Sequence, residues 1–156
     1  MHTPIKPDAD TGQSLTRAQT LTGARLRKHA DYQRAYAAGR KRQSASMSWF
    51  LAPQLPVDTG RARTEGPRIG LTVGKVIGKA HERNRIKRRM REALRRHVEL
   101  LPQGCDLILH PRRVVLTLEF AKLEAEIVRI LVHANAERVQ MTVSQALQPT
   151  VQTPAL

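Results

Sequence analysis

Apolar residues recur at helical spacing in two long segments of this chain. The first segment, residues 79–97, and the second, residues 119–137, each carry a single apolar stripe. The stripes consist of Ile86, Met90, Ala93, Leu94 and His97, and of Leu123, Ile127, Ile130, Leu131 and Ala134. A shorter helical pattern runs from Leu26 to Ala38, where Gly39 supplies a stop signal. The pattern therefore predicts three helices, of which two are amphipathic and long.

Alternating residues predict strands at 44–51 and 68–75, and a short apolar run predicts a buried strand at 106–110. In the first of these, Met47, Trp49 and Leu51 share one face. Prolines and the polar loop 54–66 separate the two alternating segments. Because only this loop lies between them, we expect the two strands to form an antiparallel pair.

The predicted element order is α-β-β-(β)-α-β-α, in which the bracketed strand is optional, and residues 112–117 leave room for a further strand. This order describes an α+β sandwich with helices packed on one small sheet. The length of 156 residues supports one compact domain, which we place at residues 25–137. Residues 1–24 and 138–156 are rich in polar residues and proline, so we expect a disordered N-terminal tail and a mobile C-terminal tail.

The first long helix carries half of the formal net charge of +14. Residues 79–96 contain two acids, Glu82 and Glu92, against nine cations: Lys79, Arg83, Arg85, Lys87, Arg88, Arg89, Arg91, Arg95 and Arg96. Ordinary solvated helix faces mix charges of both signs at i, i+4, whereas this face places like charges side by side. A nucleic-acid backbone is the natural partner, although charge alone fits a membrane surface or a heparin-like polyanion nearly as well.

Other features of the sequence narrow the class of protein. There is no apolar run long enough to span a membrane and no aromatic belt, so we expect no membrane partner. The N-terminal residues lack the apolar core of an export signal. The single cysteine, Cys105, cannot form an internal disulfide, and a small buried residue is the favoured interpretation. These features favour a cytoplasmic protein.

No catalytic or metal-binding constellation emerges from the sequence. The loop Gly74-Lys-Val-Ile-Gly78-Lys79 has three residues between its glycines where a nucleotide-binding P-loop needs four, and Ala80 follows the lysine. The six histidines are scattered, and the acids do not converge as a metal-dependent nuclease requires. We therefore predict no catalytic residue and no metal ligand in the protein.

Two tyrosines, Tyr32 and Tyr36, lie on one face of the first predicted helix at i, i+4. One interpretation is that both rings pack in the core. The other is a stacking platform for unpaired bases, assisted by Phe50 on the neighbouring strand. Gly70 and Gly74 would let a nucleic-acid backbone approach closely. The pattern alone leaves both interpretations open.

Several ordered blocks of this sequence resemble the bacterial ribonuclease P protein subunit. The basic block reads Arg83-Asn84-Arg85-x-Lys87-Arg88-x-x-Arg91-Glu92, preceded by Gly70-Leu71-Thr72-Val73 and Gly78-Lys79-Ala80. The stretch Asp31-Tyr32-Gln33-Arg34-x-Tyr36-x-x-Gly39-Arg40 resembles the first helix of that family. The resemblance spans about residues 25–136. In this chain Gly74-Lys75-Val76 stands where the family usually has Ser-Lys-Lys.

The resemblance implies a function in which the protein assists a catalytic RNA that removes the 5′ leader from precursor tRNA. It implies that cleavage belongs to the RNA, that Mg²⁺ is bound mainly by that RNA, and that the protein alone binds no cofactor. No obligate protein partner is evident from the sequence. It also implies a left-handed βαβ crossover around the basic helix. The residues it assigns to binding of the RNA subunit are Lys79, Arg83, Asn84, Arg85, Lys87, Arg88, Arg91 and Arg95. Those it assigns to a leader-binding cleft are Tyr32, Tyr36, Phe50, Arg68 and Lys75.

Three other functions fit part of the pattern. A structural ribosomal protein shares the size and charge but would not discriminate a leader. A DNA-binding module would use residues 79–97 as a recognition helix, but no helix precedes it at helix-turn-helix spacing. A self-contained nuclease lacks the carboxylates it would need.

Overall fold

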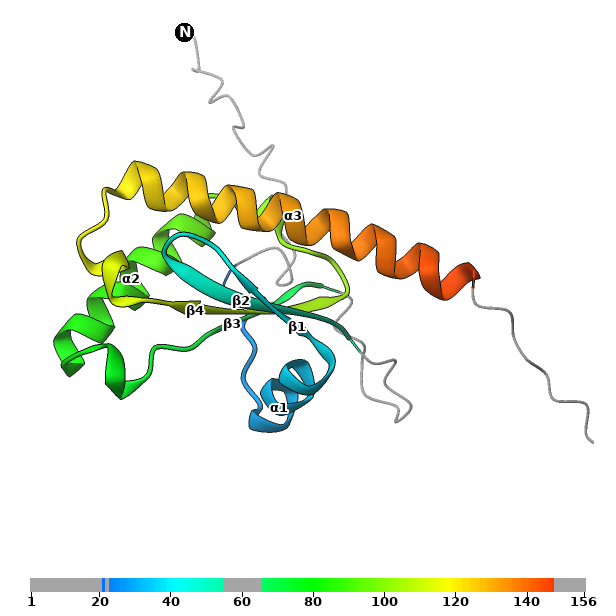
Figure 1. Ribbon diagram of the computed structural model, residues 1–156, viewed down its shortest axis with the longest axis horizontal. Coiled ribbons are helices and arrows are strands. Elements are labelled where there is room, and N and C mark those ends of the chain that lie inside the picture. The colour runs from blue at the N-terminus through cyan, green and yellow to red at the C-terminus, as the bar shows by residue number, and fades with distance from the viewer. Residues whose placement is uncertain (1–20, 22, 55–65, 148–156) are drawn as a thin grey trace, which may run out of the picture.

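The computed structural model describes residues 21, 23–54 and 66–147 and confirms the α+β class (Figure 1). Its helices are α1 (His29–Ala38), α2 (Ala80–Arg95) and α3 (Phe120–Leu147). Its strands are β1 (Arg40–Gln43), β2 (Met47–Pro53), β3 (Arg68–Leu71) and β4 (Cys105–Pro111). Three short 3₁₀ turns lie at Lys75–Ile77, Val98–Leu100 and Arg113–Leu116.

The four strands form one sheet in the order β1-β2-β4-β3. Strand β4 lies in the interior of the sheet, antiparallel to β2 and parallel to β3. The expected direct pairing of residues 44–51 with 68–75 is therefore wrong. The physical reason is that β4 is apolar on both faces, since Leu107 and Leu109 bury one face and Ile108 the other. A strand of this kind is most stable with a neighbour on each side.

Strand β1, which the sequence analysis did not locate, precedes the first predicted strand and pairs with β2 in an antiparallel ladder. The further strand considered at 112–117 is wrong, because Arg113–Leu116 forms a 3₁₀ turn that buries Val115 in the core. The turn is fixed at its start, where the backbone N–H of Arg112 donates to the carbonyl of Ser46 at 2.9 Å. Since β1 is polar and mostly exposed, no apolar alternation could have predicted it.

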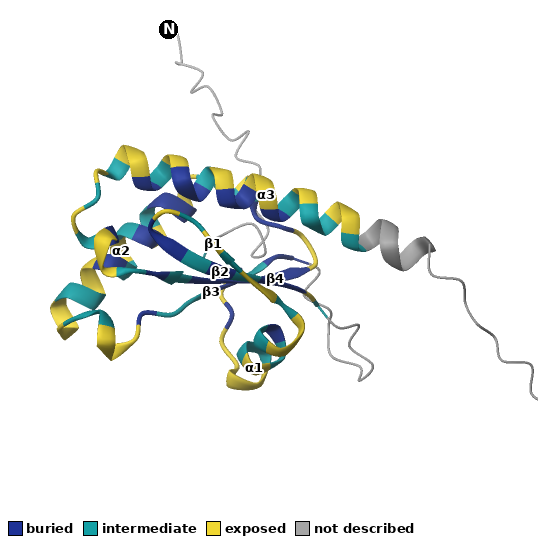
Figure 2. Ribbon diagram, in the orientation of Figure 1, coloured by how far each residue is buried: buried dark blue, intermediate teal, exposed yellow. Residues whose placement is uncertain are grey.

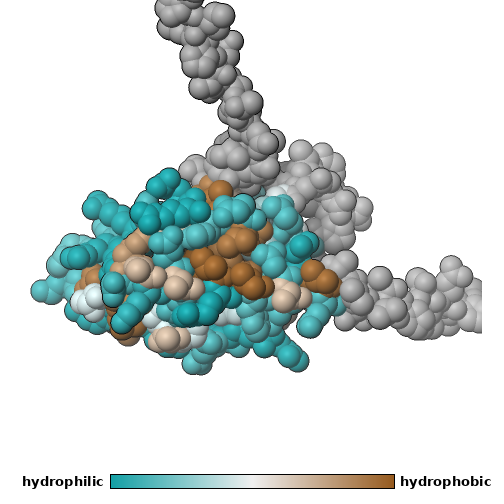
Figure 3. Space-filling model, turned by 90° about the horizontal axis from the view of Figure 1, so that it is seen from above, coloured by the Kyte–Doolittle hydropathy of each residue, from teal (hydrophilic) through white to brown (hydrophobic). Residues whose placement is uncertain are grey.

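The helices cover both faces of the sheet, with α1 on one side and α2 and α3 on the other (Figures 1 and 2). Alternation within β2 sends Trp49 and Leu51 into the large core beneath α2 and α3, and it sends Ala52 and Phe50 toward α1. Val132 of α3 is exposed. Figure 3 shows that apolar side chains gather on the face of the molecule that is seen from above. The sheet therefore has one thick core and one thin, partly open aromatic face.

The described chain packs on the sheet before the predicted domain boundary at residue 25. Ala24 is buried, and both it and Leu26 form backbone hydrogen bonds with Ile69 of β3. The N–H of Ile69 donates to the carbonyl of Ala24 at 2.6 Å, and the N–H of Leu26 donates to the carbonyl of Ile69 at 2.8 Å. At the other end, α3 ends at Leu147 rather than at residue 137. The rest of both predicted tails lies outside the described residues.

The β3-α2-β4 unit is a parallel crossover, and its left-handed sense stays a prediction. Within the described ranges, no helix is long and apolar enough to cross a membrane.

Candidate nucleic-acid interface

Helix α2 is fixed to the sheet by the predicted apolar stripe. Ile86, Met90, Ala93 and Leu94 are all buried in the large core. His97, the last residue of the predicted stripe, follows the helix instead and is half-buried, with Nε2 2.9 Å from Oε1 of Glu124 on α3. Because one side of α2 is held by aliphatic packing, its cationic side faces outward as a rigid row.

Both acids of the α2 region are occupied by contacts within the protein. Glu82 accepts the backbone N–H of Lys79 at 3.1 Å, which caps the helix, and pairs with Arg113. The hydrogen bond from Arg113 lowers the pKa of the Glu82 carboxyl. Glu92 pairs with Arg95 at 2.8 Å and with Arg96 at 3.2 Å. Glu82, near the start of α2, therefore neutralises Arg113 of the turn before α3, and Glu92 neutralises the arginines at the end of α2.

Two further arginines of this region hold the fold together. Arg89 donates to the carbonyls of Val115 at 2.7 Å and Leu116 at 2.9 Å, and it thereby attaches α2 to the turn before α3. Arg96 lies over the ring of Phe120, with its guanidinium carbon 4.8 Å from the ring centroid. These contacts give Arg89 and Arg96 structural partners.

The remaining cations of α2 have no carboxylate within ion-pair distance in the described part of the chain. Arg85, Arg88 and Arg91 are exposed, whereas Arg83 and Lys87 are half-buried. Lys79 at the N-cap and Asn84 are also exposed. Of the eight residues predicted to bind the RNA subunit, only Arg95 is neutralised by an ion pair in this part of the chain. The others form a surface that a polyanion can neutralise.

The opposite face of the sheet brings Tyr32, Tyr36 and Phe50 together. The ring centroids of Tyr36 and Phe50 are 5.0 Å apart in an edge-on arrangement, and those of Tyr32 and Tyr36 are 6.4 Å apart. All three rings pack against a small core that includes Ile108, but none of them is fully buried. The structure thus packs the rings against the core, while stacking of unpaired bases on them stays a prediction.

Sequence reasoning missed His110, the fourth ring of this cluster. Its Nε2 is 2.8 Å from the hydroxyl of Tyr36, and its ring lies 5.5 Å from that of Phe50. The hydroxyl of Tyr36 also lies 3.4 Å from Oγ1 of Thr72. The alternation of residues along β4 could have predicted this position, because it places His110 on the same face of the sheet as Ile108.

A prediction concerns Gly70, whose backbone touches the ring of Tyr32. A Cβ at this position would lie 2.7 Å from Cε1 of Tyr32, which is closer than side chains tolerate. We expect Gly70→Ala to displace the ring and to lower the free energy of unfolding by about 1–3 kcal/mol. Chemical denaturation measures this change. Gly74→Ala is the matched control, because a Cβ there meets open space. Equal stabilities of the two variants would contradict the prediction.

Arg68, one of the residues assigned to the leader cleft, is engaged within the protein. It makes two hydrogen bonds to the carboxylate of Asp106, at 2.7 and 2.9 Å, and a weaker contact to Asp31 at 3.3 Å. Burial raises the pKa of the Asp106 carboxyl, and the hydrogen bonds from Arg68 oppose that shift. Lys75 lies apart from this network, exposed on the turn that follows β3. The structure therefore brings the three aromatic residues of the predicted cleft together, while Arg68 forms an ion pair with the buried carboxylate of Asp106.

The pH dependence of folding provides a second prediction. Burial lowers the pKa of His110 below its ordinary value of 6.5, and the nearby charge of Lys41 acts in the same direction. The unfolded chain therefore takes up the proton first as the pH falls, and stability that is present above about pH 6.5 is lost below it. We expect chemical denaturation to show this loss in the wild type and a weaker pH dependence in His110→Asn. Identical pH profiles of the two proteins would contradict the assignment.

No group of three or more potential metal ligands occurs among the described residues. Cys105 is buried, and burial raises the pKa of its thiol to about 11. The interpretation of Cys105 as a small buried residue is confirmed, because it is 3% exposed at the first position of β4.

Fold and surface together define the class of this protein: a small α+β domain with one helix whose cations mostly lack carboxylate partners among the described residues. A family model described as Ribonuclease P matches residues 22–135. The ribonuclease P protein component of Chloroflexus aggregans is 37% identical over 108 residues, which cover 69% of this chain and 74% of the relative. That of Finegoldia magna is 30% identical over 116 residues, which cover 74% of this chain and 95% of the relative.

Solved structures agree with this result. The ribonuclease P protein of Thermotoga maritima matches with a TM-score of 0.57 at 25% identity, covering 69% of this chain and 94% of that chain. The protein of Staphylococcus aureus shares the fold, with a TM-score of 0.59 at 24% identity and coverage of 71% and 94%. The chain therefore belongs to the bacterial ribonuclease P protein family. It is a protein component of a ribonuclease that takes part in tRNA processing.

Proposed function

We propose that this protein binds the RNA subunit of ribonuclease P through α2 and assists that RNA in removing the 5′ leader from precursor tRNA. The observation that carries the proposal is the row of cations on α2 without carboxylate partners among the described residues. Bringing two polyanions together costs electrostatic energy, and a rigid cationic row between them lowers that cost. Arg85, Arg88 and Arg91 are exposed members of this row without a carboxylate partner among the described residues.

The aromatic face beneath α1 is the site that we assign to the single-stranded leader. Tyr32, Tyr36 and Phe50 are half-buried and pack against the small core that includes Ile108 and Ala35. Stacking on such rings contributes about 1–3 kcal/mol per base and tolerates any base. Tolerance of this kind suits a leader whose sequence differs from one precursor to the next. The face lies across the sheet from α2, so both RNAs can be bound at once (Figure 1).

Cleavage itself is assigned to the RNA subunit, with Mg²⁺ bound mainly by that RNA. The protein contributes positive charge that neutralises RNA phosphates. The two acids of the α2 region do not cancel this charge entirely, because each is held in an ion pair with specific arginines. We expect this neutralisation to lower the Mg²⁺ concentration that cleavage requires. A cytoplasmic location and independence from other protein partners stay predictions.

The experiment is cleavage of a precursor tRNA by a bacterial ribonuclease P RNA at low Mg²⁺, with and without this protein. Cleavage at the mature 5′ end that appears only with the protein supports the proposal. If the RNA cleaves equally well alone, the assigned role fails. Binding to ribosomal RNA and to duplex DNA at the same salt concentration is measured in parallel. Tighter binding to ribosomal RNA would favour a structural ribosomal role, and tighter binding to DNA a DNA-binding module.

A further inference from the structure

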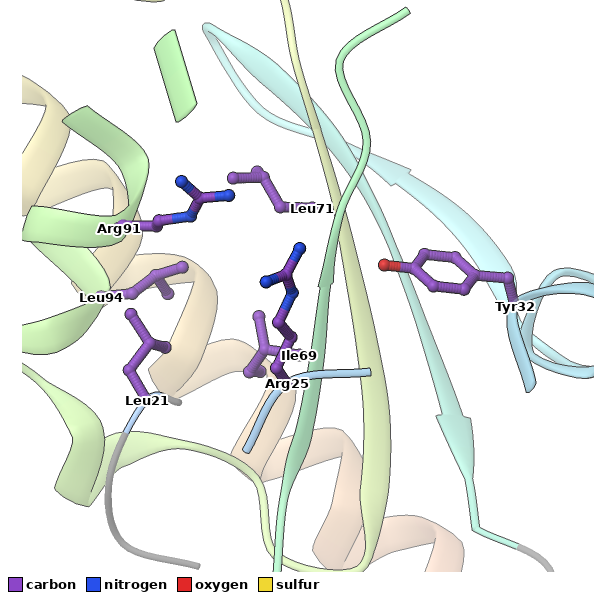
Figure 4. A pocket seen from close by; sticks show the side chains of 7 residues that line it. All are labelled: Leu21, Arg25, Tyr32, Ile69, Leu71, Arg91 and Leu94. Atoms are coloured by element: carbon purple, nitrogen blue, oxygen red, sulfur yellow. The ribbon is translucent and has the colours of Figure 1, made fainter. Parts of the chain in front are cut away.

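A pocket with a volume of about 140 Å³ lies between α2, β3 and the segment that leads into α1 (Figure 4). Among the described residues that line it, only Tyr32 also belongs to the aromatic face, and its ring lies on the far side of β3 from the other labelled side chains (Figure 4). The residues that line it are Leu21, Arg25, Tyr32, Ile69, Leu71, Arg91 and Leu94. Four of the seven are aliphatic and two are arginines, so the pocket combines an apolar floor with positive charge.

The two arginines direct their guanidinium groups into the space between α2 and β3 (Figure 4). Arg25 and Arg91 are exposed, and neither has a carboxylate within ion-pair distance in the described ranges. Among the described residues, none that lines the pocket is acidic. Two like charges at one site repel each other unless an anion lies between them, and guanidinium groups match the geometry of phosphate oxygens.

The position of Arg25 follows from the fold. Its backbone forms a parallel bridge with Ile69, and hydrogen bonds on either side of that bridge hold Ala24 and Leu26 against β3. Arg91 is placed by the burial of Met90 and Leu94 on α2. Both cations are thus attached to rigid elements, and a ligand need not order the backbone that carries them.

The apolar floor distinguishes the ligand from a bare phosphate. Leu71 and Leu94 line the pocket with Leu21 and Ile69. A cavity of about 150 Å³ lined by aliphatic side chains accepts a ring of the size of benzene, so a pocket of about 140 Å³ is of the size that one pyrimidine ring needs. RNA-binding proteins commonly bind an extruded base on apolar or guanidinium surfaces. A nucleotide uses the floor and the charges together, whereas a phosphate or an alkyl chain uses only one of them.

We propose that the pocket receives a single unpaired pyrimidine nucleotide of the RNA that α2 binds, with its base on Leu71 and Leu94 and its phosphate between Arg25 and Arg91. This inference rests on the proposed function, since it names one element of the RNA subunit that the same surface recognises. The other cations of α2 neutralise the charge of the RNA backbone. The pocket would add a contact that recognises one unpaired nucleotide.

The first test uses the full chain and three small probes: uridine 5′-monophosphate, ribose 5-phosphate and inorganic phosphate. Backbone amide NMR shifts are followed at Ile69, Leu71 and Leu94 during each titration. We expect saturable shifts with the nucleotide, at concentrations at which the other two probes have at most a tenth of the effect. Equal effects of all three probes would reduce the pocket to a phosphate site, and an absence of shifts at these residues would overturn the proposal outright.

The second test fills the pocket without changing its charge. Leu71→Phe should weaken binding of ribonuclease P RNA by about tenfold and leave the salt dependence of binding unchanged. Val132→Phe is the control, because Val132 is 55% exposed on α3, outside the pocket. Thermal unfolding checks that each variant folds. If Leu71→Phe does not fold, Arg25→Met at an exposed position replaces it, with the same expected loss and a smaller salt slope.

The outcomes separate the two proposals. A wild-type protein that does not bind the RNA overturns the proposed function and this inference with it. A wild-type protein that binds the RNA tightly, together with a Leu71→Phe variant that binds equally well, overturns only the nucleotide pocket. Crosslinking from 4-thiouridine placed in the RNA should map to the pocket residues in the wild type and disappear in the filled variant.

Discussion

Replacing Asp106 with alanine is expected to lower the free energy of unfolding by about 3–5 kcal/mol, the cost of breaking a buried ion pair from one side. The side chain of Asp106 is only 2% exposed, and its two oxygens accept hydrogen bonds from Nε and Nη2 of Arg68. Alanine would leave the guanidinium of Arg68 with the weaker contact to Asp31 alone, at 3.3 Å. Urea denaturation of the two proteins measures the difference.

The direction of the pKa shift refines this prediction. Burial raises the pKa of Asp106 above 3.8, so stability that is fully present below pH 3.8 is lost as the pH rises through the higher value of the folded state. At neutral pH the carboxylate thus carries a desolvation cost that Arg68 offsets only in part. A neutral amide avoids that cost and keeps an acceptor for Arg68. We therefore expect Asp106→Asn to lose less stability than Asp106→Ala.

Two further variants test whether the loss comes from the unpaired cation. In the double variant Arg68→Met, Asp106→Leu, apolar side chains replace both partners, and most of the lost stability should return. Glu92→Ala is the exposed control, because Glu92 also pairs with two arginines, but in solvent. It should leave the free energy of unfolding nearly unchanged. A large loss in Glu92→Ala, or none in Asp106→Ala, would contradict the argument from burial.

The sequence predicted the helices better than the sheet, for a physical reason. The stripe of α2 is a local property, since Ile86, Met90 and Leu94 follow one another on one side of a single helix. Strand order depends on which strand needs two neighbours, and that depends on the burial of both faces of β4. Strand β1 has no apolar residue at all and exists because β2 offers it an edge.

Long-range polar contacts were beyond the reach of the pattern. Glu126 of α3 is 4% exposed, and its carboxylate accepts the backbone N–H of Ser46 at 2.9 Å together with the hydroxyls of Ser44 and Ser46. These contacts join residues about 80 positions apart. Arg68 and Asp106 are a similar case, because the parallel register of β3 and β4 places them side by side. No spacing rule within one element predicts such partners.

The same limit applies to the candidate interface. The composition of the sequence located the positive charge on α2, and the family resemblance indicated which residues bind RNA. Neither could predict which of these cations are bound by other groups of the protein. Arg89 binds carbonyls of the turn before α3, and Arg95 is paired with Glu92. The pocket depends on Arg25, which a bridge to Ile69 brings beside α2. The structure thus divides one cationic helix into structural and available charges.

This division predicts different effects for two arginines of the same helix. Arg88 and Arg95 are both exposed on α2, but only Arg95 is paired with a carboxylate among the described residues. A cation that meets a phosphate releases a counterion, whereas one already neutralised by Glu92 releases less. We expect Arg88→Ala to reduce the slope of log affinity against log salt by about 0.7–0.9, with a smaller reduction in Arg95→Ala.

Equilibrium binding to ribonuclease P RNA over a range of salt concentrations measures both slopes. The double variant Arg85→Ala, Arg88→Ala should lose about twice the slope of Arg88→Ala, because neither residue has a carboxylate partner in the described chain. Removing Glu92 should convert Arg95 into an available cation, so Glu92→Ala should steepen the slope of the wild type. If Arg95→Ala and Arg88→Ala lose the same slope, and Glu92→Ala changes nothing, then pairing within the helix does not decide which cations the RNA uses.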